Sequence, residues 1–121
     1  MTKFNLQQID ESLLEEHSLL MPEDRCYFFG DYAGKQGFSY SPMNNMMHNF
    51  KKPVDRKNKL EEWQYKEKAI RDIADLLISI RQWEKLRSYT WIPMPSSKSC
   101  SDQRYDDRLM KVLNLIKCPN P

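Results

Sequence analysis

Apolar residues recur at helical spacing in the second half of the chain. From Ala69 to Trp83 they form a wide stripe on one helical face, which predicts a long helix over about residues 59–86. Asn58 followed by Glu61 has the form of a capping box, so we expect the helix to begin close to this pair.

The same pattern predicts three shorter helices. One covers residues 5–20, one begins at Ser41-Pro42 and ends near Phe50, and one covers residues 109–116. Ser41 is a favoured N-cap residue and Pro42 a favoured first helical residue. The second of these helices carries a methionine stripe, which is more typical of a core face than of a binding surface. The stripe consists of Met43, Met46, Met47 and Phe50.

Three runs of β-prone residues complete the predicted elements. Residues 26–29 and 38–40 are separated by Gly34 and Gly37 and are expected to form a loose hairpin, and residues 89–92 follow the long helix as a third strand. The expected fold is therefore α-rich, α/β or α+β, with about four helices and a small sheet of roughly three short strands.

The length of 121 residues fits one domain or the N-terminal part of one. Residues 1–53 would hold the acidic first helix, the hairpin and the methionine-rich helix. Residues 54–121 would hold the long helix, the third strand, a polar loop and the last helix. The whole chain, 1–121, is expected to form a single unit.

Composition excludes several classes of protein. With 40% hydrophobic and 30% charged residues, the chain has the balance of a globular protein. No apolar run is long enough to cross a membrane, and no signal peptide is apparent. Cys26, Cys100 and Cys118 lack the spacing of a disulfide framework or a zinc site, and His17 and His48 are isolated. We expect a soluble cytoplasmic protein without a metal site and without a membrane partner.

The net charge of +2 conceals a basic segment in the middle of the chain. Basic residues with nearby aromatic side chains can grip a phosphate backbone and stack bases, so this segment is a candidate patch for nucleic acid or a protein partner. Interleaved acids and the small net charge make nucleic acid the less favoured partner, and a solvated loop accounts for most of the pattern. The patch consists of Lys51, Lys52, Arg56, Lys57 and Lys59.

The polar loop after residues 89–92 carries the candidate chemistry. Serine hydroxyls, exposed amides and cations suit a phosphate or pyrophosphate group, although an ordinary solvated loop has the same composition. The candidate phosphate-binding residues are Ser96, Ser97, Lys98, Arg104 and Arg108. The two arginines are four residues apart and would share a face, where they could clamp an anion or pair locally with Asp102 and Asp107. Asp106 and Asp107 are expected in the first turn of the last helix.

Residues 91–98 (Trp-Ile-Pro-Met-Pro-Ser-Ser-Lys) and 104–109 (Arg-Tyr-Asp-Asp-Arg-Leu) resemble the first strand and pyrophosphate loop of type I phosphoribosyltransferase-like proteins. Residues 29–52 are similar to the N-terminal portion of uncharacterised bacterial members. The resemblance implies an incomplete phosphoribosyltransferase-like domain that recognises a pyrophosphate or nucleotide-phosphate group, with Mg²⁺ accompanying the phosphorylated ligand or with no cofactor. The family's later strand, with its two ribose-binding acids and Gly/Thr-rich loop, has no counterpart after Arg108. Whether the chain is an enzyme is left open, and catalysis by this chain alone is not expected.

Two alternatives stay open beside this interpretation. One is a non-enzymatic interaction subunit or adaptor, and the other is nucleic-acid binding through the 51–59 patch, which is the third hypothesis. Because a lone strand cannot form a sheet, we expect a protein partner or a further subunit to complete the sheet around residues 89–92.

Overall fold

Four α-helices and one short 3-10 helix dominate the part of the chain that the structure describes. The computed structural model describes residues 4–10, 17, 19–21 and 23–116. The elements in chain order are β1 (Gln7–Gln8), β2 (Tyr27–Phe28), α1 (Pro42–Phe50), η2 (Val54–Asn58), α2 (Leu60–Ile78), α3 (Trp83–Leu86) and α4 (Arg108–Ile116). The strands form one antiparallel pair, so the fold is α-rich α+β, with two strands where about three were expected. No helix among these residues is long and apolar enough to cross a membrane.

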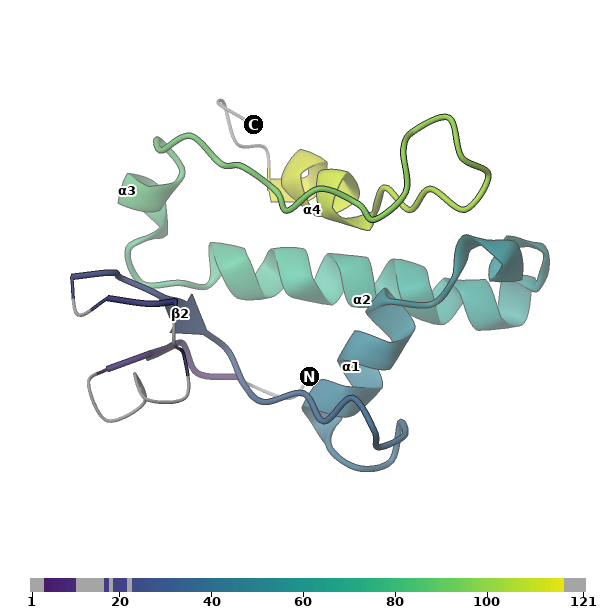
Figure 1. Ribbon diagram of the computed structural model, residues 1–121, viewed down its shortest axis with the longest axis horizontal. Coiled ribbons are helices and arrows are strands. Elements are labelled where there is room, and N and C mark those ends of the chain that lie inside the picture. The colour runs from purple at the N-terminus through teal and green to yellow at the C-terminus, as the bar shows by residue number, and fades with distance from the viewer. Residues whose placement is uncertain (1–3, 11–16, 18, 22, 117–121) are drawn as a thin grey trace.

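Helix α2 is the central element, and α1 and α4 both pack against it (Figure 1). Its buried face carries Ile70 together with Ala69 and Ala74, and the small side chains of the two alanines allow neighbouring helices to approach closely. The three helices and α3 share one apolar core. Its buried members are Phe50, Ala69, Ile70, Ala74, Trp83, Val112, Leu113 and Ile116.

Helix α1 confirms the prediction made from its sequence. The Ser41 hydroxyl accepts a hydrogen bond from the Asn44 amide at 3.0 Å, and Pro42 occupies the first turn. Met43 and Phe50 are buried, as expected for a core-facing stripe. The same end of α1 holds the preceding loop, because the fully buried Asn44 side chain bonds both main-chain groups of Ala33 at 2.9 Å.

The long helix is shorter than the sequence predicted. It ends at Ile78, and a break separates it from the single turn of α3. At the break, the Ser79 hydroxyl donates to the Leu76 carbonyl at 2.7 Å, a local bond through which serine competes with helix continuation. The predicted capping box is also wrong, because Lys59 occupies the N-cap and Asn58 belongs to η2.

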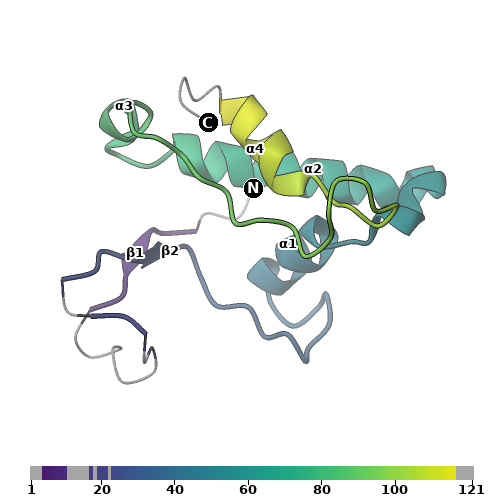
Figure 2. The ribbon, with the colours of Figure 1, turned by 45° about the horizontal axis from the view of Figure 1, so that its top comes forward.

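The N-terminal part differs most from the sequence prediction. The helix predicted over residues 5–20 is wrong at its start, where Gln7–Gln8 form β1; residues 11–16 and 18 lie outside the described residues. Residues 38–40 form turns, and Tyr27–Phe28 pair with β1 instead (Figure 2). Pairing between segments far apart in the sequence outweighs the local helical pattern here, and a further bond from the Ile9 amide to the Cys26 carbonyl at 2.9 Å extends it.

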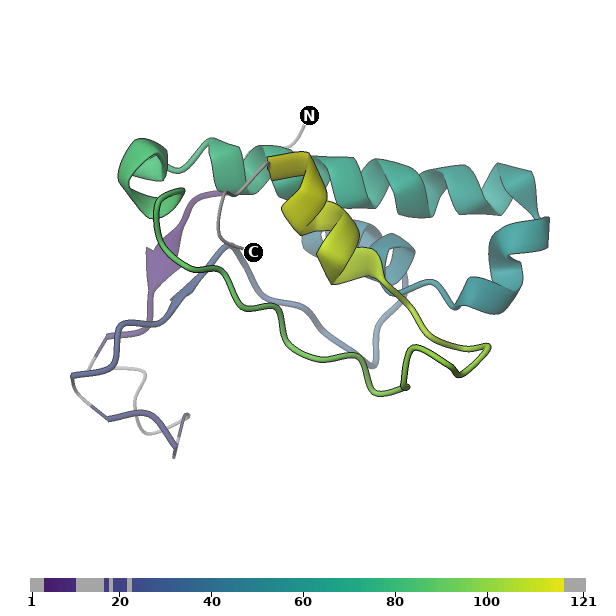
Figure 3. The ribbon, with the colours of Figure 1, turned by 90° about the horizontal axis from the view of Figure 1, so that it is seen from above.

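A long connection without regular secondary structure joins α3 to α4. Residues 89–92, predicted as a strand, have no partner strand and are not one in the structure. From α3 the connection follows the length of α2 before turning back into α4 (Figure 3). Trp91 fixes its beginning, because the indole nitrogen donates to the Leu86 carbonyl at 2.9 Å and the ring lies 5.4 Å from Trp83.

Two isoleucines on α2 test the position of the core. Ile70 is 4% exposed and Ile78 is 44% exposed. We expect Ile70→Ala to lower the free energy of unfolding by about 2–5 kcal/mol, through lost apolar burial and a residual cavity. The matched change Ile78→Ala should cost less than about 1 kcal/mol. Urea denaturation measures both, and equal losses at the two positions would contradict this arrangement of α2.

Candidate functional site

A surface pocket of about 640 Å³ contains all five candidate phosphate-binding residues. Three segments form it: the end of α1 with the start of η2, residues 93–98 of the long connection, and residues 104–110 leading into α4. We call it the loop pocket. Its lining includes Ser96, Ser97, Lys98, Arg104 and Arg108, and Lys51 from the basic patch faces it from the other side.

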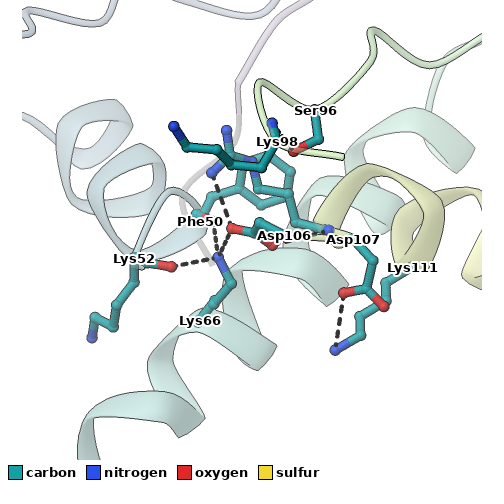
Figure 4. Close-up of polar contacts among 9 residues, drawn as sticks. Phe50, Lys52, Lys66, Ser96, Lys98, Asp106, Asp107 and Lys111 are labelled. Atoms are coloured by element: carbon teal, nitrogen blue, oxygen red, sulfur yellow. Dashed lines mark hydrogen bonds and ion pairs between the residues drawn. The ribbon is translucent and has the colours of Figure 1, made fainter. Parts of the chain in front are cut away.

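A buried ammonium group lies beside this pocket. Lys66 of α2 is 1% exposed, and its Nζ donates to three oxygen atoms (Figure 4). The acceptors are the carbonyls of Phe50 and Lys52 and the Asp106 carboxylate, each at 2.7 Å. Since the two carbonyls lie at the C-terminal end of α1, where the helix dipole is negative, the cation is well placed there. Lys66 therefore joins α1, α2 and the segment before α4.

Sequence reasoning missed Lys66, although a signal for it existed. The residue lies three positions after Trp63 and four before Ile70, on the face of α2 that is buried. A lysine on an apolar helical face is expected either to extend its head to solvent or to find buried acceptors.

Asp106 links the buried ammonium to Arg108. Besides Lys66, its carboxylate accepts hydrogen bonds from the Arg108 main-chain amide at 3.1 Å and from the guanidinium at 3.2 Å. The guanidinium also lies 5.3 Å from the centre of the Phe50 ring. Asp106 and Asp107 precede α4 and do not form its first turn, so that expectation is wrong. Asp106 instead orients Arg108 at the pocket wall.

Arg104 is held by its own loop. Its guanidinium donates to both carboxylate oxygens of Asp102, at 3.2 and 3.1 Å, and these bonds hold the pKa of Asp102 below its usual value. Of the two alternatives that the sequence left open for Arg104, an anion clamp or local pairing, the structure shows local pairing with Asp102. Arg104 lies in a turn and Arg108 begins α4, so the two do not share a helical face.

Lys98 differs from both arginines. Its main-chain amide donates to the Ser96 hydroxyl at 3.3 Å, whereas its ammonium has no hydrogen bond or ion pair with any residue that the structure describes. In Figure 4, Lys98 and Ser96 lie on the side of Asp106 away from Lys66. Lys98 is therefore the pocket cation with the fewest competing partners.

The structure divides the basic patch predicted over residues 51–59. The Lys51 ammonium lies over the Tyr32 ring and the residue lines the loop pocket. Lys52 points to α2, where it donates to the Glu62 carbonyl at 2.8 Å, and Arg56 pairs with the Glu62 carboxylate at 3.6 Å. The remaining two lysines, Lys57 and Lys59, are exposed. The five cations thus have different surroundings: Lys51 lines the loop pocket, Lys52 and Arg56 contact α2, and Lys57 and Lys59 are exposed.

A second hollow of about 400 Å³ lies between α1 and α2, and Asn45, Met46 and Tyr65 contribute to its lining. It contains none of the candidate phosphate-binding residues. No group of three or more His, Cys, Asp or Glu side chains is arranged to hold a metal ion in the part of the chain that the structure describes.

Comparison of the chain with protein-family models, curated proteins and solved structures finds no match. The interpretation of the loop pocket consequently depends on the geometry and charges described above.

Removing the buried ammonium tests the Lys66 network. We expect Lys66→Met to lower the free energy of unfolding by about 3–5 kcal/mol, because it leaves a partly buried carboxylate and two carbonyls without their donor. The control is Lys68→Met on the same helix. Lys68 pairs with Asp72 at the surface, so its loss should cost less than about 1 kcal/mol. Chemical denaturation followed by circular dichroism measures both variants, and similar losses would contradict a structural role specific to Lys66.

The burial of Lys66 also predicts a pH dependence. Burial lowers the pKa of Lys66 below its ordinary value of 10.5, and the Asp106 carboxylate opposes this shift. Between the lowered pKa and 10.5 the unfolded chain binds more protons than the folded chain, so the free energy of unfolding gains a contribution that rises with pH. The non-titrating variant Lys66→Arg provides the reference. We expect the stability difference between wild type and variant to shift in favour of wild type as pH approaches 10.5, and a shift in the opposite direction would contradict the lowered pKa.

Proposed function

We propose that the loop pocket binds a phosphorylated ligand through a pyrophosphate or nucleotide-phosphate group. The observation that carries this proposal is the convergence of three separate chain segments, which bring Lys51, Lys98 and Arg108 to one pocket. Anionic groups of this kind are bound by combinations of cations, hydroxyls and free amides. Ser96 and Ser97 supply hydroxyl groups beside Lys98.

The charges around the pocket favour an anion. Asp106 is already neutralised by Lys66 and Arg108, and Asp107 pairs with Lys111 at 3.5 Å. The Lys98 ammonium forms no ion pair with a carboxylate of the described residues, although its charge acts on Asp102 from a greater distance, and the Lys51 ammonium lies over the Tyr32 ring without an ion pair to any described residue. An incoming phosphate would therefore replace no ion pair at these two lysines.

The remaining lining suits a ligand with an apolar or planar portion. Val54, Pro93, Met94 and Leu109 line the same pocket as the cations. A volume of about 640 Å³ lies within the range of small-molecule sites, which combine mostly apolar walls with a few polar groups. A nucleotide has both parts, so it fits this lining better than an isolated phosphate.

Mg²⁺ would enter with the ligand. Magnesium in nucleotide sites is commonly held by one or two carboxylates together with phosphate oxygens. Asp55 and Asp107 line the loop pocket, and Asp55 is the one without an ion pair to any described residue, so it is the carboxylate available for that role. The proposal covers binding only: Asp106-Asp107 is followed by Arg108 and α4, and not by the Gly/Thr-rich loop that the resemblance would require for catalysis.

A thermal-shift titration tests the proposed ligand class. With Mg²⁺ present, pyrophosphate or a nucleoside diphosphate at about 100 times its Kd should stabilise the folded chain by about 2.7 kcal/mol. Lys98→Ala should weaken binding by about tenfold or more, because a charge-assisted hydrogen bond contributes about 1.5–3 kcal/mol. The shift should also shrink at high salt.

Lys57→Ala is the matched control, since it removes an exposed cation outside the pocket from the same basic segment. It should leave the affinity unchanged. Failure of every phosphorylated ligand to shift the melting temperature would contradict the proposal, as would equal losses in the two variants. A short oligonucleotide, added separately, tests the nucleic-acid hypothesis, and binding by it alone would assign function to the 51–59 patch.

A second candidate is a protein-interaction subunit. The long connection presents Ile92, which is 86% exposed, and Met94, which is 78% exposed, next to one another on the surface. Apolar side chains grouped in this way are a feature of interaction surfaces.

A further inference from the structure

Residues 90–95 form an extended segment whose main chain is unpaired. No hydrogen bond joins the main-chain groups of Thr90 to Pro95 to any residue that the structure describes. Pro93 and Pro95 fix their own backbone angles and restrict Ile92 and Met94 to the extended region. The segment is thus extended (Figure 3) but has no neighbouring strand.

The prolines make the two edges of this segment different. In an extended chain the main-chain groups of alternate residues point to opposite edges. Thr90, Ile92 and Met94 therefore share one edge, on which every residue has an N–H donor and a carbonyl acceptor. Pro93 and Pro95 share the other edge with Trp91 and cannot donate there. Only the first edge, which we call the open edge, can form a continuous ladder.

The two faces of the segment also differ. Trp91 and Pro93 are half-buried, whereas Ile92 is 86% exposed and Met94 is 78% exposed. A strand added to the open edge could cover these two apolar side chains with its own. Exposed edges of this kind readily pair with another chain unless charges or bulges block them.

We propose that the open edge pairs antiparallel with the same edge of a second copy of this chain. Around a two-fold axis, Ile92 would lie opposite Ile92 of the second copy. Thr90 of each copy would lie opposite Met94 of the other. Each of these positions exchanges both main-chain bonds, giving about six interchain hydrogen bonds. No proline enters the interface.

The observation that favours a second copy is this self-complementarity. A two-fold interface places the same patch of each subunit against itself, so the patch must match its own donors and acceptors. Thr90, Ile92 and Met94 each have a donor and an acceptor that would meet an acceptor and a donor of the second copy. The exposed Ile92 would lie on the two-fold axis. The inference does not depend on ligand binding in the loop pocket, since it uses main-chain groups that the proposed ligand site does not need.

Sedimentation analysis of the full chain tests the pairing. The average mass should rise from 14.5 kDa toward twice that value as protein concentration increases from about 10 µM to about 1 mM, a range suited to a small interface. Ile92→Pro removes the central donor of the open edge and should raise the dissociation constant at least tenfold. Thr90→Pro removes a second donor of the same edge and should have the same effect.

Pro95→Ala is the matched control, because it changes a proline on the blocked edge and should leave the association unchanged. Circular dichroism and the melting temperature establish that each variant is folded. A wild-type chain that stays monomeric over the whole range overturns the proposal. Undiminished association of both proline variants, or loss of association in Pro95→Ala, overturns it equally.

Discussion

The hydrogen bonds of one buried ammonium group hold the structure together. Lys66 is 1% exposed, so its ammonium group has lost its hydrating water. The loss of hydration is costly for any charged group. Three oxygen atoms at 2.7 Å replace the lost water, and they come from α1, from the residue after its C-cap, and from the segment before α4. Apolar packing brings α1 and α4 to α2 without specifying their ends, whereas these three bonds fix where α1 stops and where α4 begins.

The same network shapes the loop pocket. Asp106 is held by Lys66 and in turn orients Arg108, whose guanidinium lies over the Phe50 ring. Since Phe50 also supplies a carbonyl to Lys66, the cation at the pocket wall and the end of α1 are positioned by one set of contacts. The pocket consequently depends on the core of the molecule on one side and on the long connection on the other. Lys98 lies on the long connection and takes no part in the contacts of Lys66 and Asp106.

The sequence predicted the elements whose signals are local. Helix α1 has its cap and its stripe within ten residues, and α4 has a strong apolar face, so both were found. The strand pairing of residues 7–8 with 27–28 depends on contacts between distant segments and was missed. The break after Ile78 was missed because the apolar stripe continues past the local Ser79 bond at which the helix ends. The five candidate phosphate-binding residues line one pocket because they are near neighbours in the chain. Lys66 was overlooked because its acceptors come from residues 14, 16 and 40 positions away.

The connection between α3 and α4 is held at its two ends. Contact between the Trp91 and Trp83 rings fixes its start, and the Asp106 network fixes its end. Between them, residues 99–105 form turns with their own hydrogen bonds, whereas residues 90–95 run extended along α2 and make no main-chain hydrogen bond to a described residue. Two prolines then prevent pairing along one edge and leave the other open. Because Met94 belongs to that open edge and also lines the loop pocket, the proposed ligand site and the proposed dimer edge share one wall.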